Sequence, residues 1–191
     1  TRNPYFEVEA SVRWNQTSAI THELALEYEV RRDETQHLGN FENPEGGIGG
    51  VSYVFGMIRQ RTLDLTLRTS LLFSRDQSLE IYAQPFITVG DFSRARELAA
   101  PFTDAFLPYT RDGFEASDRD FRFSSVNLNA VYRWEYRPGS TLFLVWTHSR
   151  ADHEARFDDP GSFDNRLDTR AFFNTEPENR ILAKISYWIP V

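Results

Sequence analysis

Apolar and polar side chains alternate with a period of two along several segments of this chain. In segment 5–14 every second residue is apolar, and the residues between them are mostly charged or hydroxylated. Segments 20–31, 125–136 and 181–189 repeat this alternation. A period of two is typical of a β-strand with one apolar and one polar face. The pattern therefore predicts an all-β fold.

Segment 51–73 keeps its apolar residues on one parity throughout, interrupted only at Arg59 and Arg61. A two-residue hairpin at 59–61 would reverse that parity, so we predict one long strand; splitting the segment remains the alternative. Segments 79–89 and 141–148 complete the set, which gives seven strands, or eight if 51–73 is split. Pro85 lies inside 79–89 and cannot donate to a ladder, so we expect a local bulge there.

The connections between these segments alternate in length. Short turns are predicted at 15–18, 74–78 and 137–140, and long polar loops at 33–50, 91–120 and 150–179. Outer-membrane barrels have this asymmetry, and strands of about ten residues are long enough to cross a bilayer at a tilt. We therefore predict an antiparallel up-and-down meander that forms a transmembrane β-barrel or the C-terminal part of one.

A soluble β-sandwich is the alternative, because its strands also alternate with the apolar face inward. Three features favour the membrane interpretation: the strand lengths, the mixed charges of the polar face, and aromatic residues near the strand ends, as in the girdles of membrane barrels. These aromatic residues are Tyr5, Trp14, Trp134, Tyr136, Trp146, Tyr187 and Trp188.

The amino-acid composition excludes several other classes of protein. The 191 residues carry a net charge of −7, so a nucleic-acid partner is not expected, since binding phosphates requires basic clusters. There is no cysteine and therefore no disulfide framework. The longest apolar run, Leu142–Trp146, is far shorter than the roughly 20 residues of a membrane helix.

The polar face supplies the candidate functional residues. We expect them to face the lumen of a barrel that serves as a membrane anchor, pore or transport platform, without enzymatic activity, catalytic residues or cofactors. Mixed charges lining such a lumen would tune its selectivity. The candidates are Glu7, Glu9, Arg13, Glu23, Glu27, Glu29, Gln84, Asn127, Asn129, Arg133, Glu135 and Lys184.

Two acidic patterns suggest other chemistry. Glu7 with Glu9, and Glu27 with Glu29, are carboxylate pairs on one face, and glycosidases use two carboxyl groups about 5–9.5 Å apart. A glycan-binding module or an outer-membrane hydrolase is therefore the second hypothesis. Asp158, Asp159 and Asp164 are weak metal candidates, because their loop lacks the ordered spacing of a calcium site.

Two strings resemble the C-terminal region of the DUF5916 family: Tyr82–Phe86, which reads YAQPF, and Arg133–Trp146, which reads RWEYRPGSTLFLVW. With Tyr53–Arg68 and Lys184–Trp188 the resemblance spans most of 50–191. It implies large outer-membrane proteins of Gram-negative bacteria, in which a domain resembling family 9 carbohydrate-binding modules precedes a β-rich region. It implies no catalytic residue.

From this resemblance we expect residues 1–191 to be a single barrel region and the C-terminal fragment of a longer chain. The expected location is the bacterial outer membrane, and the expected partners are its lipid and a carbohydrate-binding domain of the same chain, which would link the barrel to glycan handling.

Overall fold

The described residues, 3–111, 113–161 and 163–189 of a computed structural model, form one antiparallel β-sheet. Its strands are β1 (Tyr5–Thr17), β2 (Ile20–Glu42), β3 (Val51–Ser74), β4 (Gln77–Leu98), β5 (Phe106–Pro108), β6 (Phe121–Arg137), β7 (Ser140–Ala155) and β8 (Glu178–Ser186). Two short 3-10 helices, η1 (Ala116–Arg119) and η2 (Thr169–Phe173), lie in the connections. Within the described residues, no helix is long and apolar enough to span a membrane.

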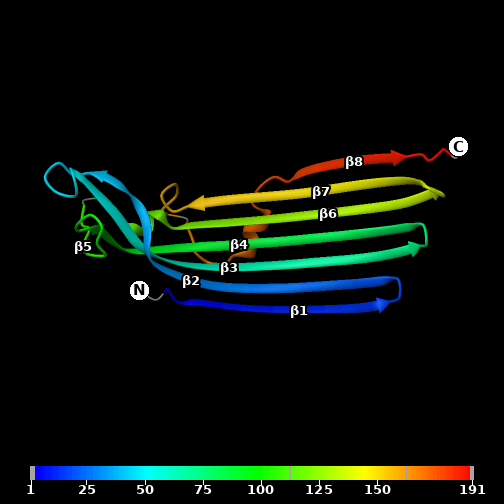
Figure 1. The fold of residues 1–191 in the computed structure, drawn as a ribbon, viewed down its shortest axis with the longest axis horizontal. Helices are drawn as coiled ribbons and strands as arrows, with labels where there is room; N and C mark the ends of the chain where they lie inside the picture. The colour runs from blue at the N-terminus through cyan, green and yellow to red at the C-terminus, as the bar shows by residue number, and fades with distance from the viewer. Residues whose placement is uncertain (1–2, 112, 162, 190–191) are drawn as a thin grey trace.

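The strands follow one another in chain order as β1-β2-β3-β4-β6-β7-β8, and the short β5 pairs with β4. This confirms the predicted all-β antiparallel meander (Figure 1). The described residues form no second sheet, so they do not form the sandwich considered as the alternative. The sheet is open between β1 and β8, and closure into a barrel therefore stays a prediction.

The hairpin turns lie where the sequence predicts them. β1 and β2 join through residues 18–19, β3 and β4 through 75–76, and β6 and β7 through 138–139. Gly139 has φ +76°, a left-handed conformation that glycine adopts without a steric penalty. The single strand predicted for 51–73 is confirmed as β3, so the path contains seven long strands rather than eight.

The predicted long loops at 33–50, 91–120 and 150–179 are too long, and this part of the prediction is wrong. β2 continues to Glu42, β4 to Leu98 and β7 to Ala155. Register shifts lie between Asp33 and Gln36 and between His37 and Gly39, where β2 pairs with β3. A ladder is held by backbone hydrogen bonds, so it continues past the point where side-chain alternation ends.

The expected bulge at Pro85 is also absent. Pro85 pairs with Val126 on β6, and β4 pairs with β3 in unchanged register on both sides of it. The β3 ladder skips the proline instead, between Asp64↔Phe86 and Leu67↔Ala83. A proline lacks the N–H that this ladder would need, so two residue pairs of the ladder are lost while the parity of the strand is preserved. At the chain end, β8 stops at Ser186 rather than at 189.

At the end of the sheet opposite the hairpin turns, the far ends of β2, β3 and β4 form a small cap with residues 99–111 and 113–120 (Figure 1). Its buried centre is made of Leu38, Val54 and Ala116, with Phe41 and Phe92 packed against it. The cap holds much of the buried apolar surface of the described residues, whereas the long central part of the sheet is a single layer.

Candidate functional site: an apolar belt and a polar face

Register decides which residues share a face of the sheet, because directly paired residues on neighbouring strands point to the same side. Phe6 pairs with Val30, Val8 with Tyr28 and Val12 with Leu24. The rows continue across the sheet; one contains Leu24, Leu67, Ala83, Leu128 and His148. Most of the alternating apolar residues of the seven long strands therefore lie on one face, which we call the apolar belt.

The belt is about ten residues tall on most of the strands. Its members are Phe6, Val8, Ala10, Val12 and Trp14 on β1; Ile20, Leu24, Leu26, Tyr28 and Val30 on β2; Leu63, Leu65, Leu67 and Leu71 on β3; Leu79, Ile81, Ala83, Ile87 and Val89 on β4; Val126, Leu128, Ala130, Tyr132 and Trp134 on β6; Leu142, Leu144 and Trp146 on β7; and Ile181, Ala183 and Ile185 on β8.

The belt runs diagonally across the rows of paired residues. Ala183, central on β8, lies in the row that reaches Ile20 on β2, whereas Ala10, central on β1, pairs with Leu26. This displacement of about six residues over the path from β1 to β8, with about 3.3 Å per residue and about 4.8 Å per strand, corresponds to strands tilted by about 35° from the normal to the belt.

Most of the belt is uncovered. Val8 is 49% exposed, Ile181 81% and Ile185 70%. Among its members only Ile87 and Val89 are fully buried, and both lie at the end nearest the cap. Apolar surface of this extent usually marks a contact with a partner or a membrane.

One polar pair lies within the belt. His22, which interrupts the apolar alternation of its segment, hydrogen-bonds through Nδ1 to Oγ1 of Thr69 at 3.0 Å. Its ring also lies 4.5 Å from that of Trp14. The two polar side chains satisfy each other, so the belt keeps its apolar character at this point.

The opposite face, which we call the polar face, carries most of the polar residues. It also carries an apolar group on β6, β7 and β8, made of Val131, Phe143, Val145 and Leu182. All twelve residues predicted to line a lumen lie on it, because their pairings keep one parity across the sheet. Several are bonded to one another or to neighbours: Arg133 pairs with Glu135 at 2.9 Å, and Thr147 donates to Asn129 at 3.0 Å. Gln84 donates to Asp64 at 2.7 Å. The polar face is thus a hydrogen-bonded surface of mixed charge.

Its most acidic part lies at the β1 edge. Glu7 pairs directly with Glu29, and Glu9 with Glu27. Asp64 on β3 pairs with Glu27 and continues the row. The sequence predicts one carboxylate pair on each of these two strands, but it does not predict that the two pairs lie directly opposite each other. Asp64 was missed, although its parity within 51–73 places it on the polar face.

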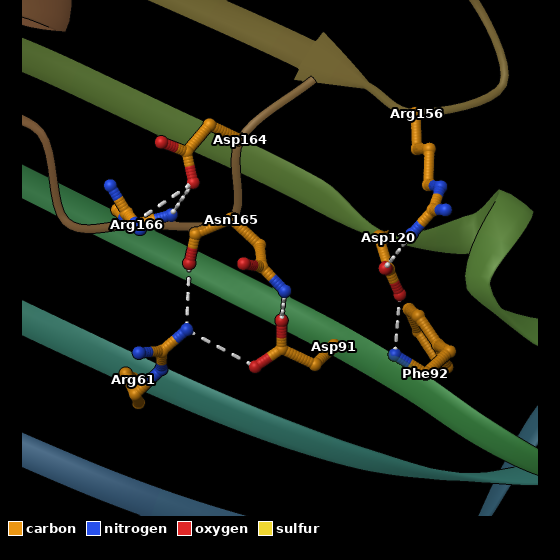
Figure 2. Close-up of polar contacts among 8 residues, drawn as sticks. All are labelled: Arg61, Asp91, Phe92, Asp120, Arg156, Asp164, Asn165 and Arg166. Atoms are coloured by element: carbon orange, nitrogen blue, oxygen red, sulfur yellow. Dashed lines mark hydrogen bonds and ion pairs between the residues drawn. The ribbon is translucent and has the colours of Figure 1, made fainter. Parts of the chain in front are cut away.

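A cluster of ionic contacts bounds the belt near the cap (Figure 2). Arg61 on β3 pairs with Asp91 on β4 at 3.2 Å and donates to the backbone carbonyl of Asn165 at 2.6 Å. The Asn165 side chain donates to Asp91. Arg122, on the same face, donates to the carbonyl of Asp164 at 3.1 Å. These contacts hold the 163–177 segment over the end of the belt.

The side-chain pattern of the sequence does not predict this cluster. Arg61 appeared only as an interruption in the apolar alternation of 51–73, and its partner Asn165 lies in a connection without a periodic pattern. A charged residue on the apolar parity is the one signal that could have indicated it. The buried Nε atoms of Arg61 and Arg122 have no hydrogen-bond partner.

Asp120 links η1 to two other elements of the cap (Figure 2). Its carboxylate accepts a hydrogen bond from the Phe92 backbone N–H at 2.6 Å and pairs with Arg156 at 3.5 Å. Burial raises the pKa of this carboxyl above its ordinary value of 3.8, and the hydrogen bond from Phe92 and the charge of Arg156 only partly offset that effect.

The three aspartates considered as weak metal candidates are not brought together as ligands. Asp164 instead lies 3.7 Å from Arg166, and its side chain accepts from the Arg166 backbone N–H. Among the residues that the structure describes, no group of three or more His, Asp or Glu side chains could hold a metal ion.

These observations define a class of protein: a single antiparallel sheet of long strands with one apolar and one polar face. The family model described as "Domain of unknown function (DUF5916)" matches residues 2–191, and the chain belongs to that family. Searches of the curated proteins and of the solved structures returned no match.

Proposed function

We propose that this chain is the wall of a β-barrel in the outer membrane of a Gram-negative bacterium, with the apolar belt against lipid and the polar face toward a lumen. The observation that carries the proposal is the diagonal course of the belt. Strands of membrane barrels are tilted by about 35–45°, and an apolar band level with the membrane must then cross the rows of paired residues obliquely.

The borders of the belt support this assignment. Trp14 and Trp134 lie at its turn-side border, where amphipathic rings of membrane barrels meet the headgroups. At the other border the belt ends at the ionic cluster of Arg61 and Asp91, which would be costly deeper in hydrocarbon. The extended strands and the cap would then project beyond the membrane.

A pair of adjacent small residues on β1 tests the proposal. Ala10 belongs to the belt and Ser11 to the polar face, and both are exposed. Each is replaced by cysteine in the full chain reconstituted in phosphatidylcholine vesicles, and labelling by a membrane-impermeant maleimide is measured. We expect Ser11→Cys to react if the lumen is water-filled and Ala10→Cys to be shielded. Equal fast labelling of Ala10→Cys would overturn the lipid assignment.

The barrel acts as an anchor, a pore or a transport platform. Mixed charges on the polar face, such as the Arg133–Glu135 pair, are compatible with a wet lumen. Solute flux through vesicles that contain the full protein tests the pore. Absence of flux would contradict the pore and leave the anchor intact.

A glycan-binding module or an outer-membrane hydrolase is the second candidate. Its support is the opposition of Glu7 to Glu29 and of Glu9 to Glu27, which places four carboxylates on one surface. Replacing Glu27 and Glu29 by Gln and measuring polysaccharide binding and cleavage tests it. Unchanged binding and cleavage in this variant would contradict a role for these carboxylates.

A further inference from the structure

β1 and β8, the two ends of the sheet, run in the same direction (Figure 1). Every neighbouring pair along the path from β1 to β8 is antiparallel, and the path contains seven strands. Direct closure would therefore place β1 and β8 side by side as a parallel pair. Antiparallel closure requires an odd number of additional strands.

A second copy of the described strands does not remove this difficulty. The argument rests on the proposed function, because copies in one barrel would share one orientation in the membrane. β1 of one copy would then meet β8 of the next, and these two strands are again parallel. The additional strand beside β1 must therefore differ in direction from β8.

The backbone of β1 is ready for such a neighbour. The N–H of Arg32 donates to the carbonyl of Pro4 at 3.0 Å. This bond shows which residues of β1 point their backbone groups toward β2, because the direction of these groups alternates along a strand. Residues of even number point their N–H and C=O groups toward β2, so those of Glu7, Glu9, Ser11 and Arg13 point to the open edge. Unpaired groups of this kind accept another strand.

The side chains at this edge specify the charge of the neighbour. Glu7 and Glu9 each oppose another glutamate, and like charges directly opposite each other destabilise a sheet. Among the described residues, none of the ion pairs includes Glu7, Glu9, Glu27 or Glu29. A basic side chain on the next strand would compensate this repulsion.

From these two observations we infer that β1 is completed by a further antiparallel strand in which apolar residues continue the belt and arginine or lysine residues lie beside Glu7 and Glu9 on the polar face. The partner is defined by its direction, its alternation and its charge. The acidic edge of the polar face is then an assembly surface rather than a site for substrate.

The sign of a stability change tests this inference. The double variant Glu7→Gln/Glu9→Gln is compared with the matched variant Glu27→Gln/Glu29→Gln, one strand farther from the edge. Both variants are made in the full-length protein, which is expressed in its native host and then transferred to phosphatidylcholine vesicles. The midpoint of urea-induced unfolding is measured by tryptophan fluorescence. Both changes relieve repulsion, but only the first removes partners of the basic strand.

We expect the Glu7/Glu9 variant to lower the midpoint by roughly a few tenths of a molar unit, and the Glu27/Glu29 variant to raise it or to lower it by less. A Glu7/Glu9 variant with an unchanged or raised midpoint would overturn the inference. The Ala10 and Ser11 labelling result is independent of this sign, so failure of the proposed function is distinguishable from failure of the inference.

Amide exchange in the unmodified protein provides a readout that needs no variant. We expect the amides of Glu9 and Ser11 to exchange as slowly as those of Ala10 and Val12, because both edges of β1 are then hydrogen-bonded. Fast exchange confined to Glu9 and Ser11 would show an open edge and contradict the inference. A disulfide formed between Val8→Cys and Ile185→Cys would also contradict it, because β1 would then lie beside β8.

Discussion

Arg61 and Asn165 lie 104 positions apart in the chain, and the Arg61 guanidinium donates to the Asn165 carbonyl at 2.6 Å. The same guanidinium pairs with Asp91, which accepts from the Asn165 side chain. The three residues therefore connect two neighbouring strands to a connection that carries no pattern of its own. Their contacts lie at the border of the apolar belt nearest the cap.

Replacing Arg61 by methionine should release the 163–177 segment. Methionine keeps an unbranched aliphatic side chain but lacks the guanidinium. Asp91 therefore loses its ion pair and the Asn165 carbonyl loses its donor, at a cost of about 1–3 kcal/mol. We expect faster proteolysis within this segment, measured by mass spectrometry of the fragments. Arg59→Met is the matched control, because Arg59 is exposed and makes no ion pair within the described residues. Equal proteolysis of both variants would contradict this role.

The cap should become less stable as pH rises. The pKa of Asp120 is raised by burial in the folded protein, so the folded state favours the protonated carboxyl. Its contribution is fully present below the unfolded pKa, near 3.8, and is lost as pH rises through the folded pKa. Amide exchange of residues 99–120 across this pH range measures the effect.

Asp120→Asn is the control for this pH dependence, because asparagine can still accept from the Phe92 N–H but does not titrate. We expect the stability of the cap to change less with pH in this variant than in the unmodified protein. If the pH dependence of cap stability is the same in Asp120→Asn as in the unmodified protein, another group must be responsible for it.

A charge on the apolar belt should cost far more than a charge on the polar face beside it. Leu26 lies in the belt, and its neighbour Ala25 faces the other side. If lipid covers the belt, Leu26→Arg should lower the free energy of unfolding in vesicles by about 2–4 kcal/mol, whereas Ala25→Arg should lower it much less. Urea titrations in phosphatidylcholine vesicles measure both. Similar costs for both variants would contradict a lipid-facing belt.

Gly56 should tolerate no side chain. A Cβ added there would lie 2.7 Å from Leu38 Cδ1 and 3.1 Å from the Ser93 carbonyl oxygen. We expect Gly56→Ala to destabilise the cap by about 1–3 kcal/mol through overpacking. The double variant Gly56→Ala/Leu38→Ala should be less destabilised than the sum of the single variants, because the clash with Leu38 is removed. Additive effects would locate the strain at Ser93 instead.

The local alternation of side chains is enough to predict most of this sheet. Period-two alternation depends only on the geometry of an extended backbone, so it identifies the strands, their two faces and the single long strand at 51–73. Turn residues such as Pro138 and Gly139 mark the hairpins for an equally local reason. All twelve predicted polar residues therefore lie on one face.

What only the tertiary structure decided depends on contacts between distant residues. Register between strands brings Glu7 opposite Glu29 and makes the belt diagonal, and no single segment contains that information. Backbone pairing carries β2, β4 and β7 beyond the end of their alternation, because ladder hydrogen bonds do not depend on side-chain type. The contact of Arg61 with Asn165 arises in the same way, since it depends on where the chain returns to the sheet.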